Sequence, residues 1–326
     1  MADFIGILLT IDAIFTWAFA SLVYKFGLQK IEAPQALLPR LLLVTLFTFA
    51  ISLLFGNYLI FTGLNFQQLI DYDIACIISG VTVTIGDLLY FHSLKKIDAS
   101  RAYPLSSLSL IFVYPFAAIF FGEIITFSIL IGGTIILIGS FFLSSKDKPK
   151  NEISSSNNVN ENSNNQEKKI KVKQKSSEDV FIGVILALGT AFFWALAIVS
   201  FNQARIIANG EVFVTNFIRI ISATIFISIF GMFKHKYYKG FKKENRIHLK
   251  YYIYIGIAGS LSLGFADSLF YKAAEINGLI FTSTITASTP LIQQLASVLI
   301  LKEKFRKRFL IAVILIILGN YIIIFL

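Results

Sequence analysis

The feature of this sequence that most constrains its fold is a succession of apolar stretches, each about as long as a lipid bilayer requires. A hydrocarbon core of about 30 Å takes roughly 20 apolar residues in a helix. Such stretches recur from end to end of the 326-residue chain. Only 15% of its residues are charged, against about a quarter in soluble domains. We therefore expect lipid, rather than water, to surround most of the chain.

The apolar stretches and the polar breaks between them predict ten transmembrane helices. The stretches do not alternate polar with apolar residues, which favours helices over the strands of a transmembrane barrel. The predicted ranges are 4–24, 33–55, 71–94, 102–121, 125–144, 180–202, 211–233, 250–274, 279–301 and 309–326. The expected fold class is an all-α membrane protein.

A polar segment divides the chain into two halves. Residues 145–179 combine lysines with a Ser/Asn tract, a composition typical of a disordered linker. We expect one five-helix unit over 1–144 and a second over 180–326. The lysines of the linker fit either a solvated cytoplasmic tether or a segment that docks on partners or lipid headgroups.

The two halves repeat each other at nearly constant spacing. The matching residues are Trp17 and Trp194, Arg40 and Arg219, Asp87 and Asp267, Glu123 and Glu303, and Gly139 and Gly319. Because five is odd, the second unit must enter the membrane from the opposite side, so the pattern predicts ten transmembrane helices as two inverted five-helix repeats. Inverted repeats are typical of transporters that work by alternating access.

The basic residues predict how the chain is oriented. Nearly all of the 29 Lys and Arg residues lie in the loops after the first, third, fifth, seventh and ninth predicted helices. The positive-inside rule puts these loops and the 145–179 linker in the cytoplasm and both termini outside. We expect a multi-pass protein of the plasma membrane. Its net charge of +10 then reflects orientation in the lipid bilayer, and no nucleic acid partner is expected.

Five ionisable residues lie inside predicted spans, where charge is costly, and are candidates for function or gating. They are Asp12, Arg40, Asp87, Arg219 and Asp267. Matching depths suggest that Arg40 pairs with Asp87 under the cytoplasmic face and Arg219 with Asp267 under the outer face. These pairs serve either as static structure or as a moving gate. Asp12 has no counterpart in the second half and fits proton coupling, a cationic substrate group or a hydrogen bond to a neighbouring helix.

Aromatic and amide side chains predict the wall of a substrate cavity. Trp17 and Trp194 rank first because they recur in both halves. The other candidates are Tyr90, Tyr103, Tyr271 and Gln293. Such a wall favours a partly apolar metabolite, such as an aromatic or branched amino acid. The alternative is that these side chains only pack against lipid and other helices.

Prolines and hydroxyl residues interrupt the fourth and ninth predicted helices. Pro104, Pro115 and Pro290 lie among Ser and Thr residues there. A bent helix near the midplane frees backbone groups that can bind a solute, whereas small residues also serve close helix packing. Glu123 and Glu303 fall in tight turns, where we expect each to cap the next helix.

These residues together resemble the EamA-type, ten-helix members of the drug/metabolite transporter superfamily. The likeness rests on Phe15-Thr16-Trp17-Ala18 and Phe193-Trp194-Ala195, on the paired arginines, and on Phe121-Gly122-Glu123 and Lys302-Glu303. The sequence departs from the family pattern at Leu110, where a proline is usual, and at Lys302, which replaces a glycine. The resemblance implies transport of small organic metabolites, amino acids among them.

The sequence therefore predicts a secondary active transporter of small organic metabolites, amino acids or similar, with export as the expected direction. Protons or an exchanged solute are the candidate coupling partners, and a monomer can enclose the site. No catalytic residues, metal or cofactor are expected, because the histidines are scattered and Cys76 is the sole cysteine. The alternatives are a membrane-embedded enzyme, and a channel or non-transporting assembly protein.

Overall fold

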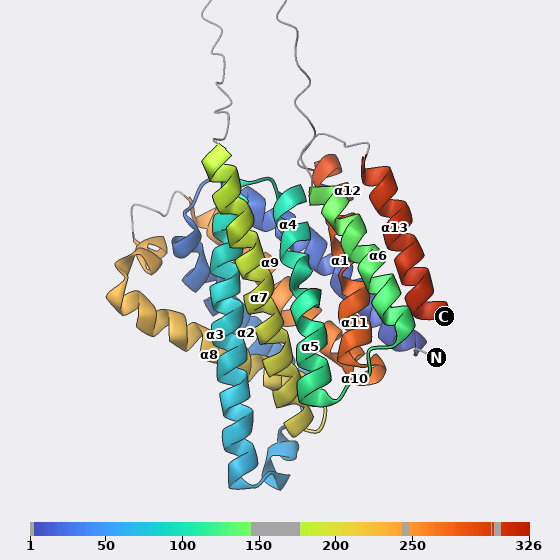
Figure 1. Ribbon diagram of the computed structural model, residues 1–326. Coiled ribbons are helices and arrows are strands. Elements are labelled where there is room, and N and C mark those ends of the chain that lie inside the picture. Colours follow the sequence, from blue (N-terminus) through green and yellow to red (C-terminus); the bar gives the residue numbers. More distant parts are fainter. Residues whose placement is uncertain (1–2, 145–176, 243–247, 301, 303–307) are drawn as a thin grey trace, which may run out of the picture.

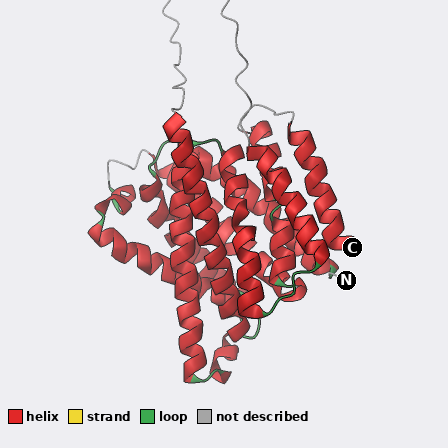
Figure 2. Ribbon diagram, viewed as in Figure 1, coloured by secondary structure: helices red, strands yellow, loops and turns green. Residues whose placement is uncertain are grey.

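The computed structural model describes residues 3–144, 177–242, 248–300, 302 and 308–326, and every regular element in these residues is a helix (Figures 1 and 2). The main helices are α1 (Phe4–Gly27), α2 (Ala33–Phe55), α3 (Phe66–Lys96), α4 (Ala99–Ser106), α5 (Leu110–Phe121), α6 (Phe127–Ser144), α7 (Ser177–Ile207), α8 (Phe213–Phe233), α9 (Leu249–Gly259), α10 (Asp267–Asn277), α11 (Leu279–Thr286), α12 (Thr289–Ile300) and α13 (Arg308–Phe325). Short 3₁₀ turns are η1 (Tyr58–Gly63), η2 (Ser107–Ser109), η3 (His235–Tyr237) and η4 (Lys239–Phe241), and η6 (Ser260–Ala266) is a π-helical segment.

Seven helical stretches of the described residues are long and apolar enough to cross a membrane. They comprise α1, α2, α3, the α4–α5 stretch, α7, α8 and the α9–α10 stretch. Shorter apolar stretches are Phe127–Phe142 in α6 and Phe309–Phe325 in α13. The chain therefore folds as an all-helical membrane protein.

Three of the predicted helices are interrupted, one of them unexpectedly. The α4–α5 stretch is broken by η2, and a break at 287–288 separates α11 from α12. The predicted helix over 250–274 is helical throughout, but η6 forms a π-helical segment between α9 and α10 that the sequence did not predict. Asn216 of α8 stabilises this segment by donating hydrogen bonds to the carbonyls of Leu263 and Gly264 at 2.8 and 3.1 Å.

Helix α3 begins earlier than its apolar residues indicate. It begins at Phe66 rather than at 71, because Asn65 and Gln68 form a capping box in which each side chain accepts from the other's backbone N–H at 2.9 Å. The first turn of α3 is therefore helical, although its polar residues lie outside the apolar stretch from which the helix was predicted.

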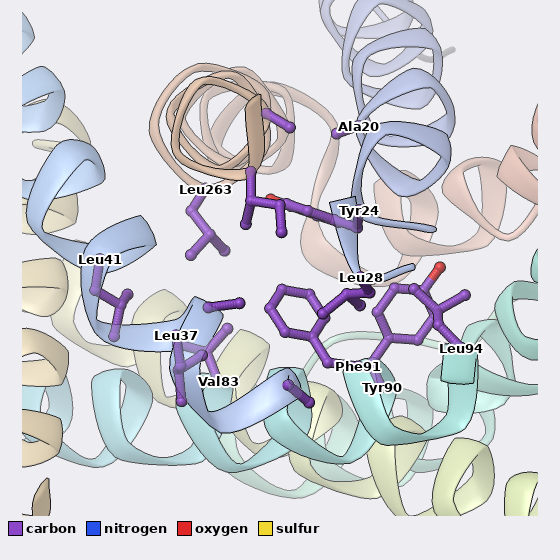
Figure 3. Close-up of a cluster of buried hydrophobic side chains, with 14 of the residues drawn as sticks. Ala20, Tyr24, Leu28, Leu37, Leu41, Val83, Tyr90, Phe91, Leu94 and Leu263 are labelled. Atoms are coloured by element: carbon purple, nitrogen blue, oxygen red, sulfur yellow. The ribbon is translucent and has the colours of Figure 1, made fainter. Parts of the chain in front are cut away.

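Helices of the first half pack on helices of the second half. Helix α2 contacts α8, α6 contacts α13, α3 lies along α7, and α10 contacts α1. Figure 3 shows the buried cluster between α1, α2 and α3, where Tyr24, Leu41 and Phe91 meet Leu263 of η6. The interior is thus built at the contact between the halves.

Glycines allow the closest of these contacts. A Cβ atom on Gly319 of α13 would lie 2.6 Å from the carbonyl oxygen of Gly132 in α6, and one on Gly132 would lie 2.6 Å from the carbonyl oxygen of Gly319. Backbone atoms cannot move aside as side chains do. These two glycines therefore set the separation of α6 and α13.

Lys302 occupies a left-handed backbone conformation that favours glycine. Its φ is +54°, close to the +65° of Gly122, the residue at the matching position of the first half. A left-handed conformation costs an L-residue about 1–2 kcal/mol. We expect Lys302→Gly to raise the free energy of unfolding by about 1 kcal/mol, and Gly122→Lys to lower it by a similar amount. Thermal unfolding in detergent measures both, and a less stable Lys302→Gly variant would contradict the expectation.

Candidate functional site

A cavity of about 130 Å³ lies at the contact between the two halves. Helices α1, α2, α3, α4 and α5 contribute to its wall from the first half, and α7, α8, α10, α11 and α12 from the second. The wall carries two arginines, two aspartates, two tryptophans and four tyrosines. Five of the six residues predicted for a substrate cavity lie on the wall of this cavity: Trp17, Tyr90, Tyr103, Trp194 and Tyr271.

The first ion pair joins α2 to α3 on this wall. Arg40 Nη1 lies 2.5 Å from Asp87 Oδ2, and both side chains are buried. Arg40 Nε donates to the Tyr24 hydroxyl at 3.1 Å, which lies 2.6 Å from the Ser262 hydroxyl. The guanidinium carbon of Arg40 also lies over the ring of Tyr24, 4.7 Å from its centre. A charge pair, a hydrogen bond and an aromatic face together hold this buried cation.

The second ion pair joins α8 to α10. Arg219 Nη1 lies 2.8 Å from Asp267 Oδ2, and both side chains are again buried. The same Nη1 donates to Asn216 Oδ1 at 3.3 Å. The guanidinium carbon lies 5.3 Å from the centre of the Phe201 ring. The pairs that matching depths predicted, Arg40 with Asp87 and Arg219 with Asp267, are therefore both formed.

Each aspartate also binds a tryptophan of the other half. Trp17 Nε1 donates to Asp267 Oδ1 at 3.0 Å, and Trp194 Nε1 donates to Asp87 Oδ1 at 3.0 Å. One carboxylate oxygen thus accepts from an arginine of its own half, and the other from a tryptophan across the interface. The two aspartates link the halves as well as the helices.

Both ion pairs lie on one cavity, whereas the sequence suggested one pair under each membrane face. Arg40, Asp87, Arg219 and Asp267 all line its wall. The expectation of two separated pairs assumed that helices run perpendicular to the membrane, so that position along the chain gives depth. In the structure both pairs meet at a single cavity between the two halves.

Aromatic rings form two groups on the cavity wall. In one, the ring centres of Tyr90 and Trp194 are 5.2 Å apart and those of Tyr103 and Trp194 are 6.4 Å apart. In the other, the Trp17 ring lies 5.5 Å from Phe270, which packs edge-on against Tyr271 at 4.9 Å. Aromatic rings thus cover much of the wall, and each charged side chain on it is paired with one of opposite charge.

Comparison with known proteins adds the decisive observation. The family model described as "EamA-like transporter family" matches residues 4–145 and again residues 181–325. The chain belongs to the EamA-like transporter family. An uncharacterized transporter of Archaeoglobus fulgidus is 22% identical over 314 residues, which cover 96% of this chain and 95% of that protein. A solved crystal structure with 13% sequence identity covers 97% of this chain and 95% of its own with a TM-score of 0.65, so the fold is similar.

Membership of the EamA-like family makes the chain a multi-pass membrane transporter with a small-molecule substrate. The central cavity is where such a protein has room for a solute. Hydroxyl groups of the interrupted helices reach it as well: Ser107, Ser109, Ser283, Thr286 and Thr289 line the wall. The breaks in α4–α5 and α11–α12 thus lie next to the cavity of this EamA-like protein.

Two of the predicted site residues do not reach the cavity of this EamA-like transporter. Asp12 is exposed on the outside of α1, and within the described residues its carboxylate has no hydrogen-bond partner. Gln293 is buried in α12 but is absent from the wall, and its amide atoms have no partner among the described residues. The two residues lie apart from the paired charges.

Sequence reasoning missed Tyr24, Ser262 and Asn216, which complete the surroundings of the arginines in this EamA-like fold. Tyr24 follows Trp17 by two helical turns and so lies on the same face of α1, a spacing that could have identified it. Ser262 and Asn216 gave no comparable signal, because both act at the π-helical segment, which the sequence does not reveal.

The histidine, cysteine and acidic side chains of the described residues are dispersed. Within them, no group of three or more His, Cys, Asp or Glu side chains is close enough together to hold an ion. Cys76 is buried in α3.

Glu123 caps a helix of the other half, so the expectation that it caps the next helix was wrong. Its carboxylate accepts from the backbone N–H groups of Leu279 and Ile280 at 2.9 and 2.7 Å, at the start of α11. The next helix, α6, uses Thr126 instead, whose hydroxyl accepts from Ile129 N at 3.3 Å. The turn after Gly122 directs Glu123 across the interface. Glu303 lies outside the described residues.

Removing this cap is expected to weaken the contact between α5 and α11. Loss of a side-chain cap costs about 0.5–2 kcal/mol, so we expect Glu123→Ala to lower the free energy of unfolding by that amount. Glu123→Gln keeps one acceptor oxygen and is expected to lose less. Denaturation in detergent measures the two variants side by side, and equal stability of wild type and Glu123→Ala would contradict the capping role.

Proposed function

We propose that this protein is a secondary active transporter that exports a small organic metabolite, an amino acid or a similar compound, by alternating access. The observation that carries the proposal is the central cavity, whose wall is built by both halves. Two tryptophan–aspartate hydrogen bonds join the halves at this wall. A site at the interface of two repeats opens to either side when one half rocks against the other.

The proposal includes ten transmembrane helices as two inverted five-helix repeats over 1–144 and 180–326, joined by the 145–179 linker. Contacts between equivalent helices support it: α2 packs on α8 and α6 on α13. At the first of these contacts the hydroxyls of Thr45 and Thr224, a repeat pair, lie 2.8 Å apart. Helices α6 and α13 run in opposite directions in Figure 1, as inverted mates do. In this reading the shorter helices α6 and α13 and the α11–α12 stretch are the remaining spans.

The proposed orientation has both termini outside and the linker in the cytoplasm of a cell whose plasma membrane holds the protein. The basic loops support it through the positive-inside rule. In Figure 1 the N and C termini lie together at one edge, away from the end where α6 finishes and α7 begins. Residues of a single chain form the wall of the cavity, which supports a monomeric transport unit.

The cavity favours a small, partly apolar solute without large net charge. Its two arginines and two aspartates neutralise each other, and tyrosine and tryptophan rings cover much of the remaining wall. An engineered protein cavity of about 150 Å³ holds benzene, so about 130 Å³ suits a group of that size. An aromatic or branched amino acid combines such a group with opposite charges that cancel.

Coupling to protons or to an exchanged solute is part of the proposal. The cavity carboxylates of Asp87 and Asp267 each accept hydrogen bonds from an arginine and a tryptophan, which stabilises their charged form. Exchange of one solute for another is compatible with carboxylates that stay charged throughout. Proton coupling through Asp12 would act from outside the cavity, on the exposed side of α1.

Uptake and counterflow in proteoliposomes test the proposed function. The assay uses a mixed pool of labelled amino acids and other small metabolites, with and without a pH gradient. Saturable counterflow of any member supports a carrier, and dependence on the gradient identifies proton coupling. Flux that never saturates supports a channel, whereas no flux with folded protein contradicts transport and favours the enzyme or assembly role.

A further inference from the structure

The two arginine sites differ in which aromatic ring carries a hydroxyl group. Arg40 lies over the rings of Tyr24 and Phe91, and Arg219 lies over those of Phe201 and Tyr271. Tyr24 of α1 and Phe201 of α7 occupy equivalent positions, because Trp17 and Trp194 precede them by the same spacing. Each ring lies under the arginine of its own half, with centre-to-guanidinium distances of 4.7 and 5.3 Å. Tyrosine supplies an acceptor oxygen at this place and phenylalanine does not.

This difference leaves Arg219 with an unused donor. Arg40 donates through Nε to Tyr24 and through Nη1 to Asp87, whereas Arg219 Nε is buried without a hydrogen-bond partner among the described residues. The hydroxyl of Ser283 is also buried without a partner there. Arg219 and Ser283 both line the cavity. An unsatisfied donor on a buried guanidinium is costly, so its place beside the cavity points to a ligand that satisfies it.

We propose that Arg219, with Ser283, binds a carboxylate group of the transported solute, while Arg40 holds the structure together. This inference rests on the proposed function and adds the group by which the solute is recognised. Arg219 Nη1 is occupied by Asp267, and Nε belongs to the opposite side of the planar guanidinium, where a carboxylate binds through two parallel hydrogen bonds. Because Arg219 Nε is buried, the solute reaches it only if neighbouring side chains, Phe201 among them, move as the solute binds.

The charge of the cavity favours a carboxylate over a phosphate. Asp87 and Asp267 already neutralise the two arginines, so the cavity has no excess positive charge to balance a dianion such as phosphate. A single negative charge that belongs to a zwitterion leaves the site neutral after binding. The aromatic wall then contacts the apolar part of the same molecule.

A hydroxyl at position 201 tests this assignment without removing a charge. In Phe201→Tyr the new oxygen can accept from Arg219 Nε, as Tyr24 does from Arg40, and so competes with the solute. We expect the variant to fold with unchanged or higher thermal stability. We expect its affinity for phenylalanine, measured by competition with the transported solute, to fall about tenfold, the loss of one charge-assisted hydrogen bond. The affinity for phenylalaninamide, which lacks the carboxylate, is expected to stay low and unchanged.

Two further variants separate this role from a structural one. Ser283→Ala is expected to weaken phenylalanine binding about threefold, since it removes a neutral hydrogen bond. Tyr24→Phe removes the partner of Arg40 Nε instead, and is expected to lower thermal stability, because Tyr24 supports Arg40 in the ion pair with Asp87. If Phe201→Tyr binds phenylalanine as tightly as the wild type, the assignment of Arg219 is wrong.

The outcome for the wild-type protein separates this inference from the proposed function. Transport of solutes without a carboxylate, or equal affinity for phenylalanine, phenylalaninamide and inorganic phosphate, overturns the carboxylate site and leaves a transporter. Absence of flux for every solute in the pool overturns the transporter itself.

Discussion

Asp87→Asn is expected to cost about 3–5 kcal/mol of folding free energy, the usual price of leaving one partner of a buried ion pair without the other. The pair is nearly inaccessible, with 2% and 5% of the Arg40 and Asp87 side chains exposed. Asparagine keeps an oxygen for Trp194 Nε1 but loses the charge that balances Arg40. Asp267→Asn is expected to act in the same way on Arg219. Denaturation of the purified protein in detergent measures both effects.

A matched control and a double variant make this prediction specific. Asp12→Asn removes another carboxylate from a span, but an exposed one with no partner among the described residues, and is expected to leave stability unchanged. Arg40→Met combined with Asp87→Leu removes both charges and is expected to recover most of the stability that Asp87→Asn loses. If both Asp87→Asn and Asp267→Asn keep wild-type stability and transport, the ion pairs neither stabilise the fold nor act as a gate.

The positions of the helices could be predicted because each one carries its own apolar signal. The interruption at η6 could not, because its free carbonyls are satisfied by Asn216, which comes from α8 and lies far away in the sequence. The capping of α11 by Glu123 was missed for the same reason. A turn sequence shows that an acidic residue is available as a cap, but only the packing of the two halves decides which helix it reaches.

The site residues that could be predicted are those that recur in both halves of the sequence. Recurrence in both halves identified the arginines, aspartates and tryptophans, and their spacing predicted the ion pairs. The hydrogen bonds from Trp17 and Trp194 to the aspartates cross between halves, and no spacing within one half encodes them. Asp12 could have been excluded from the cavity wall, since five residues turn it well away from the face of α1 that carries Trp17.

A disulfide between α2 and α8 is expected to stop transport if the halves rock against each other. Thr45 and Thr224 are repeat mates whose hydroxyl oxygens lie 2.8 Å apart, so cysteines at these positions are near enough to form a disulfide. The native chain has one cysteine, Cys76, and it is buried, so oxidation is expected to form a disulfide between the two new cysteines without involving Cys76. We expect oxidation of the Thr45→Cys, Thr224→Cys variant to lower counterflow in proteoliposomes at least about tenfold, and reduction to restore it.

The contact between Thr45 and Thr224 is informative because it lies where equivalent helices of the two halves meet. Alternating access about this interface changes how α2 and α8 cross, and a covalent bond there resists the change. Each single cysteine variant, treated with the same oxidant, controls for damage elsewhere. If the fully cross-linked protein exchanges solute at the wild-type rate, α2 and α8 move as one body, and the motion that opens the cavity must lie elsewhere, with the interrupted α4–α5 and α11–α12 stretches as the remaining moving parts.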